Sequence, residues 1–273
     1  MATRHIHSSR QSAVSSQTLP SSRLGVVVGI GTGVSTTATQ WATHHAATHR
    51  IPLTLVTTGT TASQTIKTGW DSLPLVRAIA VDAPLEHTLI QLSAQAEIVA
   101  LGNDCPSTHR TLSALVRRGH SNVASIPEAA ADLRLPVIVL IDGLRSSEPA
   151  IRAAFDEASR RHASLIAVHT WSEPGHLGFP AISWSPIEWA NNREQEREVL
   201  AERLAGFQEL YPDVRVRRIT TSDSNCKPLV TDARSAQLIV VGTGANAKLA
   251  DISRVAAFRQ LTTSEVPVLV AKR

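Results

Sequence analysis

A succession of strand-like and helical segments occurs twice in this chain of 273 residues, and it limits the folds that are available. In the first copy, an unbroken apolar run at Leu24–Ile30 precedes a helical pattern and a second apolar run at Ile51–Val56. The order recurs with Pro136–Ile141, a helical pattern at Ala150–His162 and the run Leu165–His169. Unbroken apolar strands separated by helices predict parallel sheets that are buried on both faces. A repeat of this length predicts tandem α/β domains.

The later parts of the two copies also correspond. Ala96–Gly102 aligns with Gln237–Gly242, and each of these runs ends in glycine. A strand at Val76–Val81 before a helix matches a strand at Val214–Ile219 before another helix. We therefore expect two Rossmann-like domains, each with a five-stranded, mostly parallel sheet flanked by about four helices.

The expected domain boundaries follow from changes in composition. Residues 1–23 are rich in serine and arginine and contain no acidic residue, which predicts a disordered tail. The first domain is expected at 24–127, a linker at 128–135 and the second domain at 136–273.

The clearest helical pattern is at Arg193–Tyr211. Its apolar residues fall on one face at intervals of three and four: Leu200, Leu204, Phe207 and Tyr211. The preceding segment, Trp171–Asn192, is rich in Pro, Gly and Trp, and we expect a long loop there.

Composition excludes several classes of protein. The net charge of +4 is modest and the basic residues alternate with acidic ones, so no nucleic-acid partner is expected. No apolar run reaches the roughly 18 residues that span a membrane, so no membrane partner is expected. Cys105 and Cys226 lie far apart, which is typical of a reducing cytoplasm and predicts no disulfide framework.

The second copy resembles the tandem universal stress proteins of actinobacteria. Trp171-Ser-Glu-Pro, Leu200-Ala-Glu-Arg-Leu-Ala and Tyr211-Pro-Asp-Val-Arg-Val carry this resemblance, as does the glycine that ends Gln237–Gly242. The family's phosphate loop reads glycine, two residues, glycine, nine residues, glycine and then serine or threonine. Here the loop after Gly242 is several residues shorter, and Ala250 and Asp251 stand at the final Gly-Ser.

The resemblance implies a candidate ATP pocket in the second domain, since an aspartate after the first strand borders adenine in the family. The candidate residues are Asp142, Gly143, Val168, Gly242, Gly244 and Ser253. The shortened loop and Asp251 weigh against a triphosphate, so the loop is degenerate. In the first copy Gly31 replaces the aspartate and Asp104 places an acid in the phosphate region, so we expect no nucleotide there.

The resemblance further implies a cytoplasmic, non-enzymatic regulator of the stress response. It would act through unidentified protein partners, with adenine nucleotide as a candidate modulator. Universal stress domains commonly pair through their last strands, so Val266–Ala271 is expected to meet Val123–Ile126 within the chain, and a homodimer is a further candidate. Two alternatives remain open: a ligand-free interaction scaffold that has lost ATP binding, and a weak ATP hydrolase.

Histidines are the remaining candidates for chemistry. His45 and His49 are four positions apart on a helix, but the sequence reveals no third ligand, so we expect a surface pair and no metal site. His169 follows a strand and is expected to be a loop or core residue. We expect no catalytic residue.

Overall fold

A computed structural model describes most of the two repeated copies. The described residues are 24–30, 36–58, 73, 75–129, 131–141, 147–171, 186–222, 236–243 and 264–272. The tail predicted at residues 1–23 lies outside this part of the chain.

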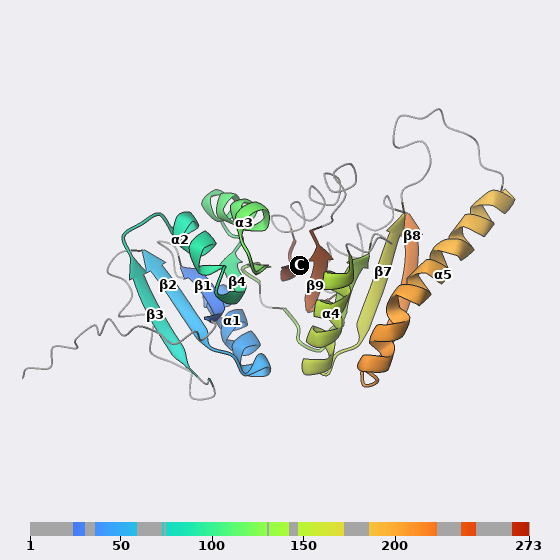
Figure 1. Ribbon diagram of the computed structural model, residues 1–273, viewed down its shortest axis with the longest axis horizontal. Helices are drawn as coiled ribbons and strands as arrows, with labels where there is room; N and C mark the ends of the chain where they lie inside the picture. Colours follow the sequence, from blue (N-terminus) through green and yellow to red (C-terminus); the bar gives the residue numbers. More distant parts are fainter. Residues whose placement is uncertain are drawn as a thin grey trace, which may run out of the picture.

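The strands of the described residues form one sheet of ten strands (Figure 1). They are β1 (Gly25–Ile30), β2 (Leu53–Thr58), β3 (Val76–Val81), β4 (Ala96–Gly102), β5 (Asn122–Ile126), β6 (Val137–Ile141), β7 (Leu165–Trp171), β8 (Val216–Ser222), β9 (Leu238–Gly242) and β10 (Val268–Ala271). Their order across the sheet is β3-β2-β1-β4-β5-β10-β9-β6-β7-β8. Strands β1–β5 thus form a first half and β6–β10 a second half with the same internal order. This confirms the predicted α/β class with its repeated, mostly parallel sheet.

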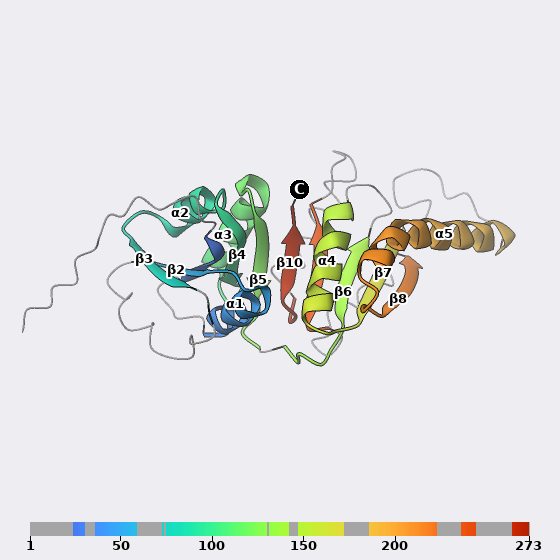
Figure 2. The same ribbon diagram turned by 60° about the horizontal axis from the view of Figure 1, so that its bottom comes forward.

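The two halves meet at an antiparallel seam between β5 and β10, while the other neighbouring strands are parallel. Strands β5 and β10 lie side by side (Figure 2), and Val270 is opposite Val123 and Leu269 opposite Ala124 in the register. The seam confirms the expected pairing of the last strands within one chain. It covers two apolar edges that would otherwise be free to pair with another molecule.

Five helices lie among the described residues and cover the two faces of the sheet. They are α1 (Thr36–His49), α2 (Leu85–Leu92), α3 (Pro106–Arg118), α4 (Glu148–Arg160) and α5 (Pro186–Leu210). Buried residues of α1, α4 and α5 share one apolar core, which extends across both halves. Buried residues of α2 and α3 belong to the core on the opposite face. The sheet is therefore the middle layer of a three-layer arrangement.

Alternation of side chains between the two faces explains why β6 is apolar throughout. Val137, Val139 and Ile141 belong to the core beneath α4, whereas Ile138 between them belongs to the opposite core. Successive side chains of a strand point to opposite faces, so a strand covered on both faces needs apolar residues at every position.

Helix α5 starts earlier than the sequence indicated. It begins at Pro186, so the loop predicted to extend to Asn192 is wrong over residues 186–192. Proline is compatible with the first turn of a helix, where its missing N–H has no intrahelical partner. The predicted apolar face is confirmed: Leu200 and Leu204 are buried, and Phe207 and Tyr211 pack against the same core.

Polar contacts reinforce the seam at the end of β10. Nζ of Lys272 donates to the carbonyl oxygen of Leu115 at 2.8 Å and also to that of Gly119, both at the C-terminal end of α3. The backbone N of Lys272 donates to Oδ1 of Asn122 at 2.9 Å. A residue of the second half thus satisfies carbonyls of a helix in the first. None of the described helices is both long and apolar enough to cross a lipid bilayer.

Candidate functional site

The carboxyl ends of β6, β7 and β9 lie side by side at one edge of the second half. Strand β6 pairs in parallel with β7 on one side and with β9 on the other. Ligands of such sheets bind beyond the carboxyl ends of the strands. Val168 is fully buried in β7, and Gly242 ends β9. Asp142, Gly143, Gly244 and Ser253 lie outside the described residues, so the predicted pocket is described only at Val168 and Gly242.

His169 uses both ring nitrogens at this edge. Its side chain is 2% exposed; Nδ1 lies 3.0 Å from the carbonyl oxygen of Ile141, and Nε2 lies 2.7 Å from Oε2 of Glu196 on α5. A carbonyl oxygen only accepts, so Nδ1 donates to Ile141, while Nε2 faces the Glu196 carboxylate. His169 is a buried residue, as expected. The sequence did not indicate Glu196 as its partner, because the two residues lie on separate elements.

At the corresponding edge of the first half, the connection between β4 and α3 is short and is held by hydrogen bonds. Residues 103–105 alone separate β4 from α3. Asn103 donates through its backbone N to the Ile126 carbonyl at 2.9 Å and through Nδ2 to the Ser264 carbonyl at 3.2 Å. Its own carbonyl oxygen lies 2.7 Å from Nε2 of His109. These bonds hold the connection against the sheet, so its backbone forms no long loop around a ligand.

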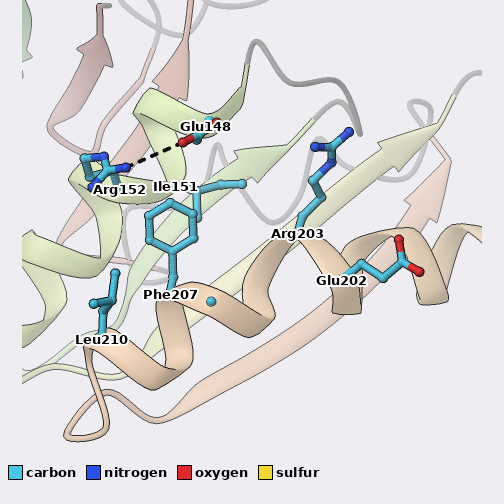
Figure 3. A pocket seen from close by; sticks show the side chains of 8 residues that line it. Glu148, Ile151, Arg152, Glu202, Arg203, Phe207 and Leu210 are labelled. Carbon is cyan, nitrogen blue, oxygen red and sulfur yellow. Dashed lines mark hydrogen bonds and ion pairs between the residues drawn. The ribbon is translucent and has the colours of Figure 1, made fainter.

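A groove of about 330 Å³ lies between α4 and α5 (Figure 3). Ile151, Phe207 and Leu210 supply apolar surface, and Leu210 is 66% exposed. The Arg152 guanidinium lies 5.4 Å from the centre of the Phe207 ring, within cation–π range. The groove is therefore lined by both apolar and charged side chains.

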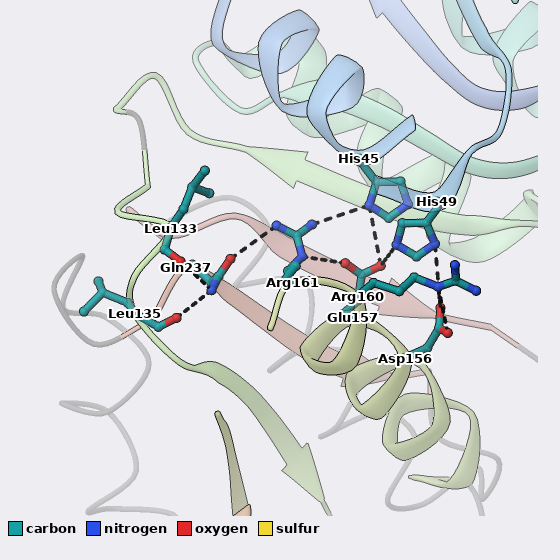
Figure 4. Close-up of polar contacts among 9 residues, drawn as sticks. All are labelled: His45, His49, Leu133, Leu135, Asp156, Glu157, Arg160, Arg161 and Gln237. Carbon is teal, nitrogen blue, oxygen red and sulfur yellow. Dashed lines mark hydrogen bonds and ion pairs between the residues drawn. The ribbon is translucent and has the colours of Figure 1, made fainter. Parts of the chain in front are cut away.

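A buried cluster joins α1 of the first half to α4 of the second (Figure 4). We call it the seam cluster; it consists of His45, His49, Glu157 and Arg161. Oε1 of Glu157 lies 3.5 Å from Nδ1 of His45 and 3.1 Å from Nε2 of His49. Oε2 of the same carboxylate accepts from Nε of Arg161 at 2.7 Å.

The seam cluster corrects the expectation of a surface histidine pair without a third ligand. The His45 side chain is 1% exposed and that of His49 is 11% exposed. Their rings stack with centroids 4.0 Å apart, and Trp41 stacks on His45 at 4.9 Å. The sequence did not indicate Glu157 as a neighbour of these histidines, because α4, which covers this face of α1, is more than a hundred positions away along the chain.

Burial and neighbouring charges shift the pKa values of His45 and Glu157 in the seam cluster. Burial lowers the pKa of His45 to about 3, although the nearby Glu157 carboxylate acts in the opposite direction. Burial alone would raise the pKa of Glu157, but the imidazoles of His45 and His49 and the Arg161 guanidinium lower it. Glu157 is therefore an ionised carboxylate at neutral pH in spite of its burial.

Comparison of the sequence with known proteins identifies a family. Residues 134–272 match the model of the universal stress protein family. A universal stress protein of Mycobacterium tuberculosis is 38% identical over 195 residues, covering 68% of this chain but only 62% of that relative's length. A second universal stress protein of that organism is 34% identical and covers 93% of this chain and 99% of its own.

A solved structure shows the same fold. The crystal structure of a universal stress protein from Pseudomonas aeruginosa superposes with a TM-score of 0.60 at 16% identity, covering 92% of this chain and 94% of that one. The repeated sheet, the family model and the relative aligned along nearly its whole length agree. The chain belongs to the universal stress protein family.

Proposed function

We propose that this protein is a non-catalytic regulator that acts in the cytoplasm through contacts with other proteins, modulated by adenine nucleotide bound in its second half. The observation that carries the proposal is the edge formed by β6, β7 and β9. Three parallel strand ends converge there, as in nucleotide-binding α/β sheets. The candidate binding residues are Asp142, Gly143, Val168, Gly242, Gly244 and Ser253.

The hydrogen bonds of His169 favour a binding role over a catalytic one. A general base needs a nitrogen that can reach the substrate, whereas His169 directs Nδ1 to Ile141 and Nε2 to Glu196. Because Nδ1 donates to Ile141, only Nε2 could accept a proton from a ligand, and its contact with Glu196 would first have to break.

Calorimetric titration of the full chain with ATP and AMP tests the nucleotide part of the proposal. We expect micromolar binding that Asp142→Ala weakens at least tenfold, because the family resemblance places this aspartate beside the base. Asp82→Ala is the matched control, since Asp82 is an exposed carboxylate next to a strand of the first half. The absence of binding up to millimolar nucleotide would favour a ligand-free scaffold, and phosphate release that depends on Asp142 would favour a hydrolase.

A further inference from the structure

Strand β6 ends at the point where the strand order of the second half reverses, with β7 on one side of it and β9 on the other. Its register with β9 extends only to Val139, whereas its register with β7 continues to Ile141. Ligands of α/β sheets bind in the crevice at such a reversal. The end of β6 therefore borders the expected crevice and is paired with a neighbouring strand on one side only.

The His169 ring provides a further hold on this strand end. Its Nδ1 donates to the carbonyl oxygen of Ile141 at 3.0 Å, and its side chain is 2% exposed. Asp142 follows Ile141 directly in the chain, and the peptide unit that joins two such residues is planar. A hydrogen bond to the oxygen of that unit therefore fixes the orientation of the whole unit, and with it the direction in which the chain leaves β6.

Helix α5 in turn holds the ring. Nε2 of His169 lies 2.7 Å from Oε2 of Glu196, whose side chain is 28% exposed. The rotation of an imidazole about its bond to Cβ has broad energy wells, so the ring is defined by its polar partners more than by its own torsion. Contacts at both nitrogens fix this rotation, and His169 thus connects α5 to the end of β6.

The first half offers an internal comparison. Thr57 lies opposite Ile30 in the register of β1 and β2, as His169 lies opposite Ile141 in that of β6 and β7. Thr57 is 3% exposed, and within the described part of the chain its Oγ1 has no hydrogen-bond partner, so this hydroxyl does not hold the end of β1. A glycine follows Ile30, whereas an aspartate follows Ile141. The side-chain bond to the strand end thus occurs in the half that keeps the candidate ligand residue.

We propose that His169, held by Glu196, is a positioning residue for the nucleotide: its bond to Ile141 sets the direction of the backbone that continues into Asp142. This role rests on the proposed function, because it requires adenine nucleotide at this edge. The ring itself would touch no part of the ligand, since it is buried and both of its nitrogens face protein groups. Loss of the bond should therefore weaken binding by removing pre-organisation of the site and not by removing a contact.

Calorimetric titration of the full chain with ATP tests the role through two substitutions of His169. The amide nitrogen of Asn occupies the place of Nδ1, whereas that of Gln extends to the place of Nε2. His169→Asn keeps a donor for Ile141 and should bind ATP within about twofold of the wild type, whereas His169→Gln should bind about tenfold more weakly. The carbonyl-carbon NMR resonance of Ile141 reports the bond without ligand, and it should move more in His169→Gln than in His169→Asn.

A substitution on α5 covers the case in which neither variant of His169 folds. Glu196→Ala leaves the ring in place but removes its second contact, and it should weaken ATP binding about threefold. Glu198→Ala is the matched control, because Glu198 is an exposed carboxylate on the same helix, and it should have no effect. Equal ATP affinities of these two variants would overturn the role of Glu196 and with it the proposal.

The remaining outcomes separate this role from the proposed function. A wild type that binds no ATP up to millimolar concentration would overturn the proposed function, and the positioning role would fall with it. ATP binding by the wild type that His169→Gln leaves unchanged would overturn the positioning role alone. Equal losses of affinity in His169→Asn and His169→Gln would assign the effect to packing of the ring and not to its bond with Ile141, which would overturn that role as well.

Discussion

Nε of Arg161 lies 2.7 Å from Oε2 of Glu157, and the two side chains are only 2% and 4% exposed. The pair lies one helical turn apart at the end of α4 and faces α1 of the other half. Gln237, just before β9, accepts from Nη1 of Arg161 and donates to the carbonyls of Leu133 and Leu135. A single buried pair thus connects both halves and the segment between them.

Removing only one member of this pair should be costly. We expect Arg161→Met to lower the free energy of unfolding by about 3–5 kcal/mol, because it leaves the Glu157 carboxylate buried without its cation. Replacing both residues by Met should recover most of this loss, since no unpaired charge then remains. Urea titration measures the free energy of unfolding of both variants. Arg160→Met is the control: its pair with Asp156 is partly exposed and should contribute about 1 kcal/mol or less. An Arg161→Met protein as stable as the wild type would contradict the prediction.

The seam should make the two halves unfold together. Leu269 is 1% exposed in the central strand β10, so Leu269→Ala should cost about 2–5 kcal/mol. Because the sheet and one core extend across both halves, tryptophan fluorescence and far-ultraviolet circular dichroism should report one coincident urea transition. Leu133→Ala, at a residue that is 52% exposed, should change stability by about 0.5 kcal/mol or less. Two separate transitions in the wild type would show that the halves unfold independently.

Lys272 should stabilise the junction with α3. Lys272→Met removes the two charge-assisted bonds to the carbonyls of Leu115 and Gly119, and we expect a loss of about 1–2 kcal/mol in urea unfolding. Arg117→Met tests whether positive charge alone matters, because Arg117 is an exposed cation in the last turn of the same helix. Its effect should stay within a few tenths of a kcal/mol. Equal losses in both variants would assign the effect to the helix dipole and not to the hydrogen bonds.

Cys105 should react at a lower pH than an ordinary thiol. The Ser107 hydroxyl, 3.0 Å from Sγ, and then Thr108 lower the pKa of Cys105 by hydrogen bonding to the thiolate. In a Cys226→Ala background, the iodoacetamide rate should rise with pH around a midpoint below the ordinary value of about 8.5. Ser107→Ala should move that midpoint upward, whereas Ser113→Ala, further along the same helix, should leave it unchanged. The same midpoint with and without Ser107 would exclude this hydroxyl as the cause.

Several elements of the fold were visible in the sequence because their signals are local. Val76–Val81 and Ala96–Gly102 were located to the residue as β3 and β4, because both runs are largely apolar, although β3 at the edge of the sheet is only partly buried. The apolar face of α5 followed from its period of three and four residues. The start of α5 at Pro186 could not be predicted from the sequence, because proline and tryptophan in that segment are also typical of a loop.

The sequence by itself determined the α/β class, the repeated strand order, the family and the two last strands that pair at the seam. These follow from apolar periodicity, from glycines at strand ends and from a resemblance that extends along the chain. Only the tertiary structure decided that His169 meets Glu196, and that His45 and His49 meet Glu157 and Arg161. The physical reason is that such contacts depend on how helices lie on the sheet. Two residues that are remote in sequence leave no local pattern when packing brings their side chains together.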